Sequence, residues 1–157
     1  MKKNKLLILF FVGCILHPTL AFAQLKTFPF EQIDSLQKIE KRTVVIFIYT
    51  DWCKYCHTMK NTTLKDKKIV NQLNNNFYFI EFNAEEKRTV LFKGQSLKYK
   101  PTGNNNGIHQ LAEQLAIVNN KIAYPTLCFL NADFEIIFQI SDYISGSHLI
   151  KLLKSAL

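Results

Sequence analysis

Apolar residues follow two different spacings along the chain, and their order predicts an α/β domain. Residues 44–49 and 77–82 are almost continuously apolar, which is typical of strands that are covered on both faces. Residues 30–41 carry apolar side chains at helical spacing, as do residues 53–73 with a break near 61–63. The order strand, helix, strand predicts two parallel strands joined by a crossover.

An insertion is expected at about residues 88–108, after the second strand. Residues 89–92 and 96–99 flank Lys93-Gly94-Gln95 and predict a β-hairpin, and residues 101–107 form a turn-rich loop. The insertion either contributes to partner choice or is a decorative hairpin at the edge of the domain.

The last third of the chain predicts a helix, a pair of strands and a final helix. Residues 108–116 place their apolar side chains on one helical face, and Asn119-Asn120 is expected to end this helix. Residues 126–130 and 135–140 have a short connection, which predicts antiparallel pairing. Residues 147–156 form a helix that starts with a serine cap. Together these elements predict a central mixed β-sheet flanked by helices.

The N-terminus predicts export. Three lysines precede an apolar stretch over residues 6–16, and Ala21-Phe22-Ala23 stands before Gln24. This pattern is typical of a secretory signal peptide over residues 1–23, which leaves a single periplasmic domain over residues 24–157. The alternative is a lipid anchor on Cys14.

The charge of the chain excludes one class of partner. The net charge is +8 and falls to +5 when the three lysines of the signal peptide are removed. The remaining lysines are spread among acidic residues, and no basic stripe alternates with aromatic side chains. A nucleic-acid groove is therefore not expected.

The chemistry of the chain is expected at Cys53 and Cys56, directly after the first strand. Cysteines three positions apart lie across one helical turn, so they can form and break a disulfide with little backbone movement. As a structural staple the pair would close a very small loop and add little stability. Reversible thiol chemistry explains it better. Cys128 lies in an apolar strand, where it is expected to pack in the core.

The chain resembles the thioredoxin superfamily over most of the mature domain. The resemblance is carried by the strand 44–49, by Trp52-Cys53-Lys54-Tyr55-Cys56 and by Tyr124-Pro125-Thr126 at the start of a late strand. It implies a thioredoxin fold and a thiol–disulfide oxidoreductase whose only cofactor is the redox-active Cys53–Cys56 disulfide, with no metal. The extra residues 88–108 look more like exported bacterial relatives, including the soluble domain of the transmembrane disulfide reductase.

The resemblance also implies a role for each site residue. Cys53 is implied to be an exposed nucleophile at a helix N-terminus, and Cys56 the resolving thiol. Five residues are expected to shape the substrate site or its charge, with Pro125 in a cis peptide bond: Trp52, Lys54, Tyr55, Tyr124 and Pro125. The implied partners are protein disulfides and a membrane protein that supplies or removes electrons. Reduction is favoured over oxidation.

One position departs from the thioredoxin pattern. Thioredoxin has a buried acid six residues before its first cysteine, and this chain has Phe47 there. The proton acceptor for the resolving thiol is therefore unassigned. Glu81 on the neighbouring strand and His57 are candidates to tune the thiols, although Glu81 could instead point to solvent and His57 lie on the helix surface.

Two other uses of the cysteines remain as alternatives. Cys53-Lys54-Tyr55-Cys56-His57 also matches the attachment motif of c-type haem, which would need His109 or His148 as the second iron ligand. A reduced dithiol could also hold Cu(I) in a metal or assembly chaperone without turnover. A zinc site would need a fourth ligand that the motif does not supply.

Overall fold

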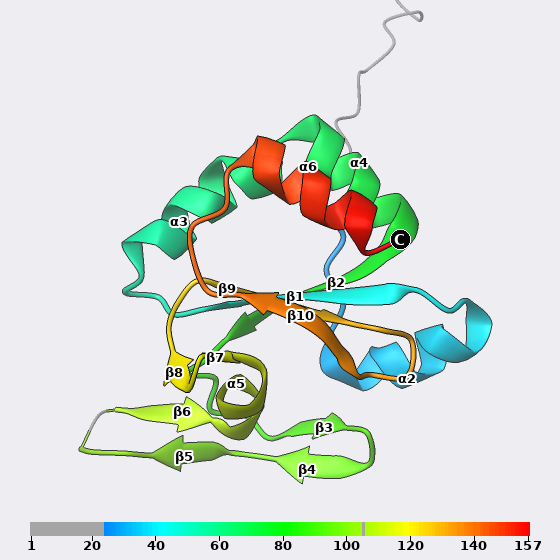
Figure 1. Ribbon diagram of the computed structural model, residues 1–157. Coiled ribbons are helices and arrows are strands. Elements are labelled where there is room, and N and C mark those ends of the chain that lie inside the picture. The colour runs from blue at the N-terminus through cyan, green and yellow to red at the C-terminus, as the bar shows by residue number, and fades with distance from the viewer. Residues whose placement is uncertain (1–23, 105) are drawn as a thin grey trace, which may run out of the picture.

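A computed structural model describes residues 24–104 and 106–157. The predicted signal peptide and Cys14 lie outside these residues. A four-stranded sheet with the order β10-β9-β1-β2 forms the centre (Figure 1). As predicted, β1 (Thr43–Tyr49) runs parallel to β2 (Phe77–Asn83), and β9 (Thr126–Leu130) pairs antiparallel with β10 (Ile136–Ile140). β9 also pairs antiparallel with β1.

Helices cover one face of the sheet and carry the cysteine pair. These elements are α3 (Lys54–Asn61), the 3₁₀ turn η1 (Thr63–Lys65), α4 (Lys67–Asn76) and α6 (Gly146–Ser155). Figure 1 shows them above the sheet. Asp66 caps α4 by accepting the backbone N–H groups of Lys68 and Ile69. The predicted break after α3 is therefore a real boundary between two helices.

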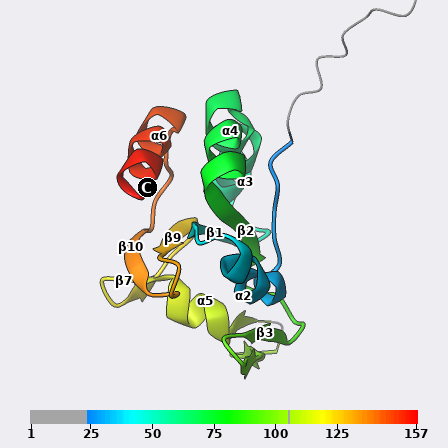
Figure 2. The same ribbon diagram turned by 90° about the vertical axis from the view of Figure 1, so that its right-hand side faces the viewer.

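The opposite face is covered by α2 (Phe30–Ile39), α5 (Gln110–Leu115) and small hairpins, as Figure 2 shows. The buried side chains of β1 alternate between the two layers. Val44, Ile46 and Ile48 pack with α2 and α5, whereas Val45 and Phe47 pack with α3, α4 and α6. This alternation explains why the strand reads as continuously apolar.

The insertion contains two hairpins where one was predicted. The predicted hairpin is β3 (Val90–Phe92) with β4 (Gln95–Leu97), turned by Lys93 and Gly94, which both have positive φ. The second consists of β5 (Tyr99–Pro101) and β6 (Gly107–His109).

Three local predictions on the second half of the chain were wrong. Ile108 lies in β6, and His109 caps α5, so this helix is shorter than its apolar pattern suggested. Asn119 and Asn120 form the positive-φ turn between β7 (Ile117–Val118) and β8 (Lys121–Ile122). The N-cap of α6 is Ser145, whose side chain makes no capping hydrogen bond.

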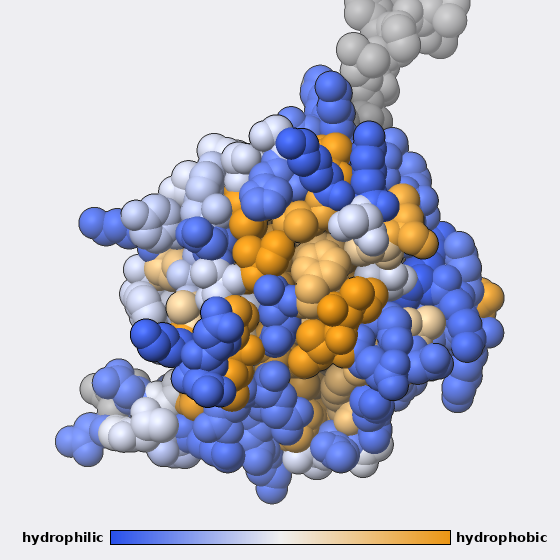
Figure 3. All heavy atoms as spheres, in the orientation of Figure 1, coloured by the Kyte–Doolittle hydropathy of each residue, from blue (hydrophilic) through white to orange (hydrophobic). Residues whose placement is uncertain are grey.

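One edge of the sheet presents apolar side chains. Ile136 and Ile137 of β10 are each 46% exposed, and Figure 3 shows apolar atoms gathered at the centre of this face and framed by hydrophilic ones. Within the described residues, no helix is both long and apolar enough to span a membrane.

Candidate active site

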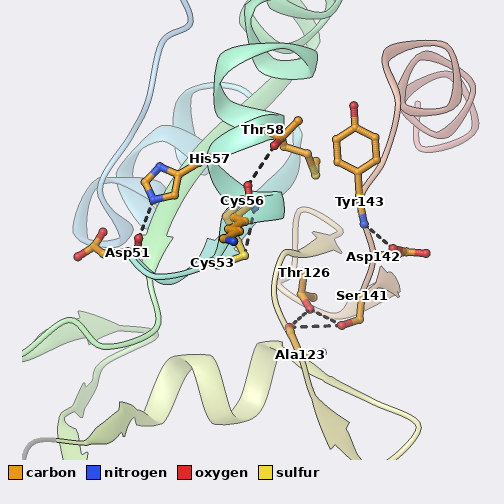
Figure 4. Close-up of a disulfide and its surroundings, with 12 residues drawn as sticks. Asp51, Cys53, Cys56, His57, Thr58, Ala123, Thr126, Ser141, Asp142 and Tyr143 are labelled. Carbon is orange, nitrogen blue, oxygen red and sulfur yellow. Dashed lines mark hydrogen bonds between the residues drawn. A yellow bond between two sulfur atoms is a disulfide. The ribbon is translucent and has the colours of Figure 1, made fainter.

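The two cysteines lie where β1 passes into α3. Cys53 is the N-cap of α3, and it forms a disulfide with Cys56 across the first turn, with a Cα–Cα distance of 5.2 Å. The backbone N–H of Cys56 points at Cys53 Sγ, with a nitrogen–sulfur distance of 3.1 Å (Figure 4). An N–H group and the positive end of a helix both favour a thiolate at this position when the pair is reduced.

The disulfide is more buried than expected. Cys53 is 5% exposed and Cys56 is 1% exposed, and both belong to the core cluster beneath α3. The prediction of an exposed nucleophile was therefore wrong for this oxidised form, because Cys53 packs in the core cluster with distant residues such as Leu127 and Ile144. Cys53 still has the larger accessible surface of the two cysteines.

Trp52 and Tyr124 border the disulfide on the N-terminal side of Cys53. Their rings meet edge to face with centroids 6.1 Å apart, and Trp52 is 67% exposed. Burial raises the pKa of the Tyr124 phenol to about 12. The peptide bond between Tyr124 and Pro125 is cis.

A small hydrogen-bond network holds the segment around Pro125. Thr126 Oγ1 donates to the carbonyl of Ala123 at 2.8 Å and bonds with Ser141 Oγ at 3.0 Å, while Ser141 Oγ also donates to the Ala123 carbonyl at 3.3 Å (Figure 4). These bonds join the segment before β9 to the loop that follows β10. The sequence did not single out Ser141 or this loop, because their pairing depends on the register of two strands.

The two charged neighbours of the cysteines lie at the surface. Lys54 is the first residue of α3 and is exposed. The ring of His57 bonds through Nε2 to the carbonyl oxygen of Asp51, with a distance of 2.6 Å. Thus His57 ties the start of α3 to the turn before Cys53, and its Nε2 atom, which could otherwise ligate a haem iron, has a partner.

Phe47 and Glu81 lie side by side on β1 and β2. Phe47 is fully buried and stacks on Tyr49 at 5.7 Å between ring centroids. Glu81 is partly buried and binds Lys60, with 3.0 Å between Oε2 and Nζ. The Nζ of Lys60 also lies 3.3 Å from the centroid of the Tyr49 ring. Glu81 therefore does not simply face solvent.

A family model described as a thioredoxin-like domain matches residues 29–157. The chain belongs to this family. Solved structures of the same fold agree over most of the chain, although their sequences are distant. A structure titled DsbH oxidoreductase has 18% identity and a TM-score of 0.60, with 90% of each chain covered. A thioredoxin from Thermus thermophilus has 18% identity and a TM-score of 0.59, with 84% of this chain and 86% of that chain covered.

A third similar structure is a complex of ferredoxin:thioredoxin reductase with thioredoxin f2. The matched chain has 15% identity and a TM-score of 0.53, with 86% of this chain and 96% of that chain covered. Among curated protein sequences, none matches this chain. A thioredoxin-like domain with a Cys-x-x-Cys pair at disulfide distance is a thiol–disulfide oxidoreductase.

The third cysteine of the thioredoxin-like domain packs in the core, as predicted. Cys128 is a free, fully buried thiol in β9, and burial raises its pKa to about 12. A thiol with so high a pKa is a poor nucleophile at neutral pH. Across residues 24–104 and 106–157, no three His, Cys, Asp or Glu side chains gather as metal ligands.

Proposed function

We propose that this thioredoxin-like protein reduces disulfide bonds in exported proteins, with Cys53 as the attacking thiol and Cys56 as the resolving thiol. The observation that carries the proposal is the different position of the two sulfurs. Cys53 caps α3, receives the Cys56 N–H group and is the more accessible cysteine, whereas Cys56 lies one turn inside and is almost fully buried. An attacking thiol must meet its substrate, and a resolving thiol needs only to reach Cys53.

The reaction needs both thiols. The Cys53 thiolate attacks one sulfur of the substrate disulfide, so a mixed disulfide forms and the released substrate thiolate takes up a proton. Cys56 then loses its proton and attacks Cys53 Sγ, which breaks the mixed disulfide and releases the second substrate thiolate. Two electrons pass to the substrate, and the protein ends with the Cys53–Cys56 disulfide.

Trp52 and Pro125 form two sides of the proposed substrate groove. The exposed indole of Trp52 offers an apolar surface beside Cys53, and the backbone at Tyr124 and Pro125 leads into β9. An extended substrate segment can pair with such a backbone edge while its cysteine faces Cys53.

The proton acceptor for Cys56 belongs to the proposal as well. Glu81 is the candidate, because it lies on the α3 side of the sheet and binds Lys60, which follows Cys56 by one helical turn. An unchanged pH profile of thiol exchange in the Glu81→Gln variant would remove Glu81 from the mechanism.

The electron donor in this proposal is a membrane protein with a reactive dithiol. The N-terminal pattern that predicts export supports this, because a donor must carry electrons across the membrane to reach an exported domain. The solved complex of a thioredoxin with a reductase supports docking of this fold with a redox partner. The reduced domain would then pass its electrons to protein disulfides without a further cofactor.

The reduction potential of the Cys53/Cys56 pair tests the direction of the reaction. Trp52 is the single tryptophan of the chain, so its fluorescence reports the state of the pair during titration with glutathione or dithiothreitol. A reductase is expected to have a potential of about −270 mV, and a value of about −120 mV would make the protein an oxidant. Tight Cu(I) binding without any exchange with disulfides would favour a metal chaperone instead.

A further inference from the structure

The helices above the sheet carry the excess positive charge of the domain. Along the sequence the lysines are spread among acidic residues, but folding brings α3, η1, α4 and α6 together as one helical layer over residues 54–76 and 146–155 (Figure 1). This layer holds seven lysines and one acidic side chain, Asp66. The rest of residues 24–157 holds ten basic and eleven acidic side chains, so it is nearly neutral.

Lysines of α4 and α6 lie on the outer surface of the helical layer. α6 packs on the sheet through Leu149 and Leu153, which are buried, whereas Lys151 and Lys154 are exposed on its other side. In the same way α4 buries three apolar side chains and exposes Lys68. Figure 2 shows α4 and α6 side by side, where they are in contact. These lysines therefore belong to one continuous surface.

Ion pairs neutralise basic side chains mainly outside the helical layer. Four basic side chains there each bind a carboxylate: Arg42, Arg88, Lys41 and Lys100. In the layer, Lys60 binds Glu81. Four exposed lysines of the layer have no ion-pair partner among residues 24–104 and 106–157: Lys54, Lys68, Lys151 and Lys154. Their charges are available to an anion from outside the domain.

The type of basic residue favours a membrane over a protein as the partner of this surface. All seven basic side chains of the helical layer are lysines, and both arginines of the chain, Arg42 and Arg88, lie outside it. Protein interfaces are enriched in arginine, whose planar group forms paired hydrogen bonds with carboxylates, and are depleted in lysine. Clusters of four to eight basic residues are typical of surfaces that bind anionic lipid headgroups through charge.

We propose that the helical layer binds the surface of a membrane that is rich in anionic phospholipids. This binding goes beyond the proposed redox reaction and does not depend on it, because no thiol takes part. Cys53 caps the end of α3, so it lies at the border of the layer and not on the outer surface of α4 and α6. A domain that rests on its helices therefore keeps the disulfide at its side, where a membrane protein can reach it.

Co-sedimentation with lipid vesicles tests the proposal on the domain over residues 24–157, which contains both core clusters. Residues 1–23 are omitted, because their lysines and apolar stretch would bind lipid by themselves. Vesicles of equal parts phosphatidylglycerol and phosphatidylcholine should bind the domain in low salt. About 0.5 M NaCl should release it, because salt screens the charges. Vesicles of phosphatidylcholine alone should not bind it.

A double variant on α6 identifies the surface that binds. Each lysine close to an anionic membrane strengthens binding about fivefold, so Lys151→Gln/Lys154→Gln should bind about twentyfold more weakly than wild type. The matched control is Lys38→Gln/Lys98→Gln, which removes the same charge from exposed positions on the other side of the sheet. That side is more than a Debye length of about 8 Å from the lipid, so the control should bind within about twofold of wild type.

Several results would contradict the proposal. Equal loss of binding in the two double variants would show that net charge, and not the helical layer, attracts the lipid. Binding to neutral vesicles, or binding that persists in high salt, would exclude an electrostatic contact. If the domain bound polyglutamate but no vesicle, the layer would be a site for an acidic protein instead. Should the α6 variant not fold, Lys68→Gln on α4 should weaken binding about fivefold. None of these outcomes depends on disulfide exchange.

Discussion

The indole Nε1 of Trp52 donates a hydrogen bond to Oε1 of Glu85 at 3.0 Å. Glu85 follows β2, at the entrance to the insertion, and its backbone N–H donates to Asn83 Oδ1 at 2.9 Å. Asn83 in turn donates to Asp51 Oδ2 at 3.0 Å. The residue before Cys53 is thus held by the segment from which the insertion begins. Hydrogen bonds therefore connect the active site to the start of the insertion.

Loss of the Glu85 carboxylate should free the Trp52 ring. In the Glu85→Ala variant the indole loses this hydrogen bond and keeps its edge contact with Tyr124. We expect a lower time-resolved fluorescence anisotropy for Trp52, whose emission has no other tryptophan to obscure it. Glu86→Ala is the matched control, because Glu86 pairs with Arg88. Equal anisotropy in all three proteins would show that the bond to Glu85 does not hold the ring.

The two cysteine variants should fail at different steps. Cys53→Ser should reduce thiol–disulfide exchange to the background rate, because the remaining thiol of Cys56 is buried. Cys56→Ser should still form mixed disulfides but cannot resolve them, so partner proteins should be trapped on Cys53. Non-reducing electrophoresis and mass spectrometry detect these adducts. Full activity in Cys53→Ser would refute the assignment of the nucleophile.

The sequence predicted the parts of the site that depend on local pattern. Three features can each be recognised from a few neighbouring residues: the apolar strand 44–49, the cysteine spacing and the Tyr124-Pro125-Thr126 segment. Tyr143 cannot be recognised from its neighbours, since its place beside Tyr55 depends on how β10 pairs with β9 and on how Ile144 contacts α3. The burial of Cys53 was also missed, because it arises from packing against residues far along the chain.

The insertion shows the same limit. The turn at Lys93-Gly94 could be predicted from its glycine, and both residues have positive φ there. In contrast, β5 and β6 are joined by a longer loop than β3 and β4, and Ile108 fits a helical pattern as well as a strand. The outcome there was decided by tertiary contacts, such as the hydrogen bond from the His109 N–H to the Ala84 carbonyl at 2.8 Å.

Gly107 should be essential to the second hairpin. A Cβ atom at this position would lie 2.4 Å from the Tyr99 ring and 2.5 Å from the carbonyl oxygen of Lys100, so the strands would have to move apart. We expect Gly107→Ala to lower the free energy of unfolding by about 1–3 kcal/mol. The matched control is Gly103→Ala, where a Cβ meets no atom within 4 Å. Urea denaturation of both variants measures the difference, and equal stabilities would contradict the close packing at Gly107.

His109 should make the stability of the domain depend on pH. Its side chain is fully buried, Nδ1 accepts the Leu111 N–H at 3.1 Å, and Nε2 has no hydrogen-bond partner among the residues that the structure describes. This arrangement requires the neutral ring with its proton on Nε2. Protonation would place a charge in the core and remove the acceptor that caps α5.

Burial lowers the pKa of His109 below its usual value of 6.5. The nearby backbone groups of Arg88 and Leu97 and the charge of Glu86 raise this pKa, but by less than burial lowers it. The charge of Arg88 lowers the pKa further. Because the unfolded chain then binds a proton that the folded protein does not, stability is complete above about pH 6.5. It falls as the pH drops towards the folded pKa, with a slope of at most about 1.4 kcal/mol per pH unit.

The His109→Asn variant separates this effect from other titrating groups. Asparagine keeps a capping acceptor for Leu111 but carries no ionisable ring. We expect the free energy of unfolding, measured with urea between about pH 7.5 and 5.5, to fall with decreasing pH more steeply in the wild-type protein than in this variant. His148→Asn is the control, because His148 is exposed on α6. If wild type and His109→Asn lost stability in parallel, the buried ring would not be the group whose protonation opposes folding.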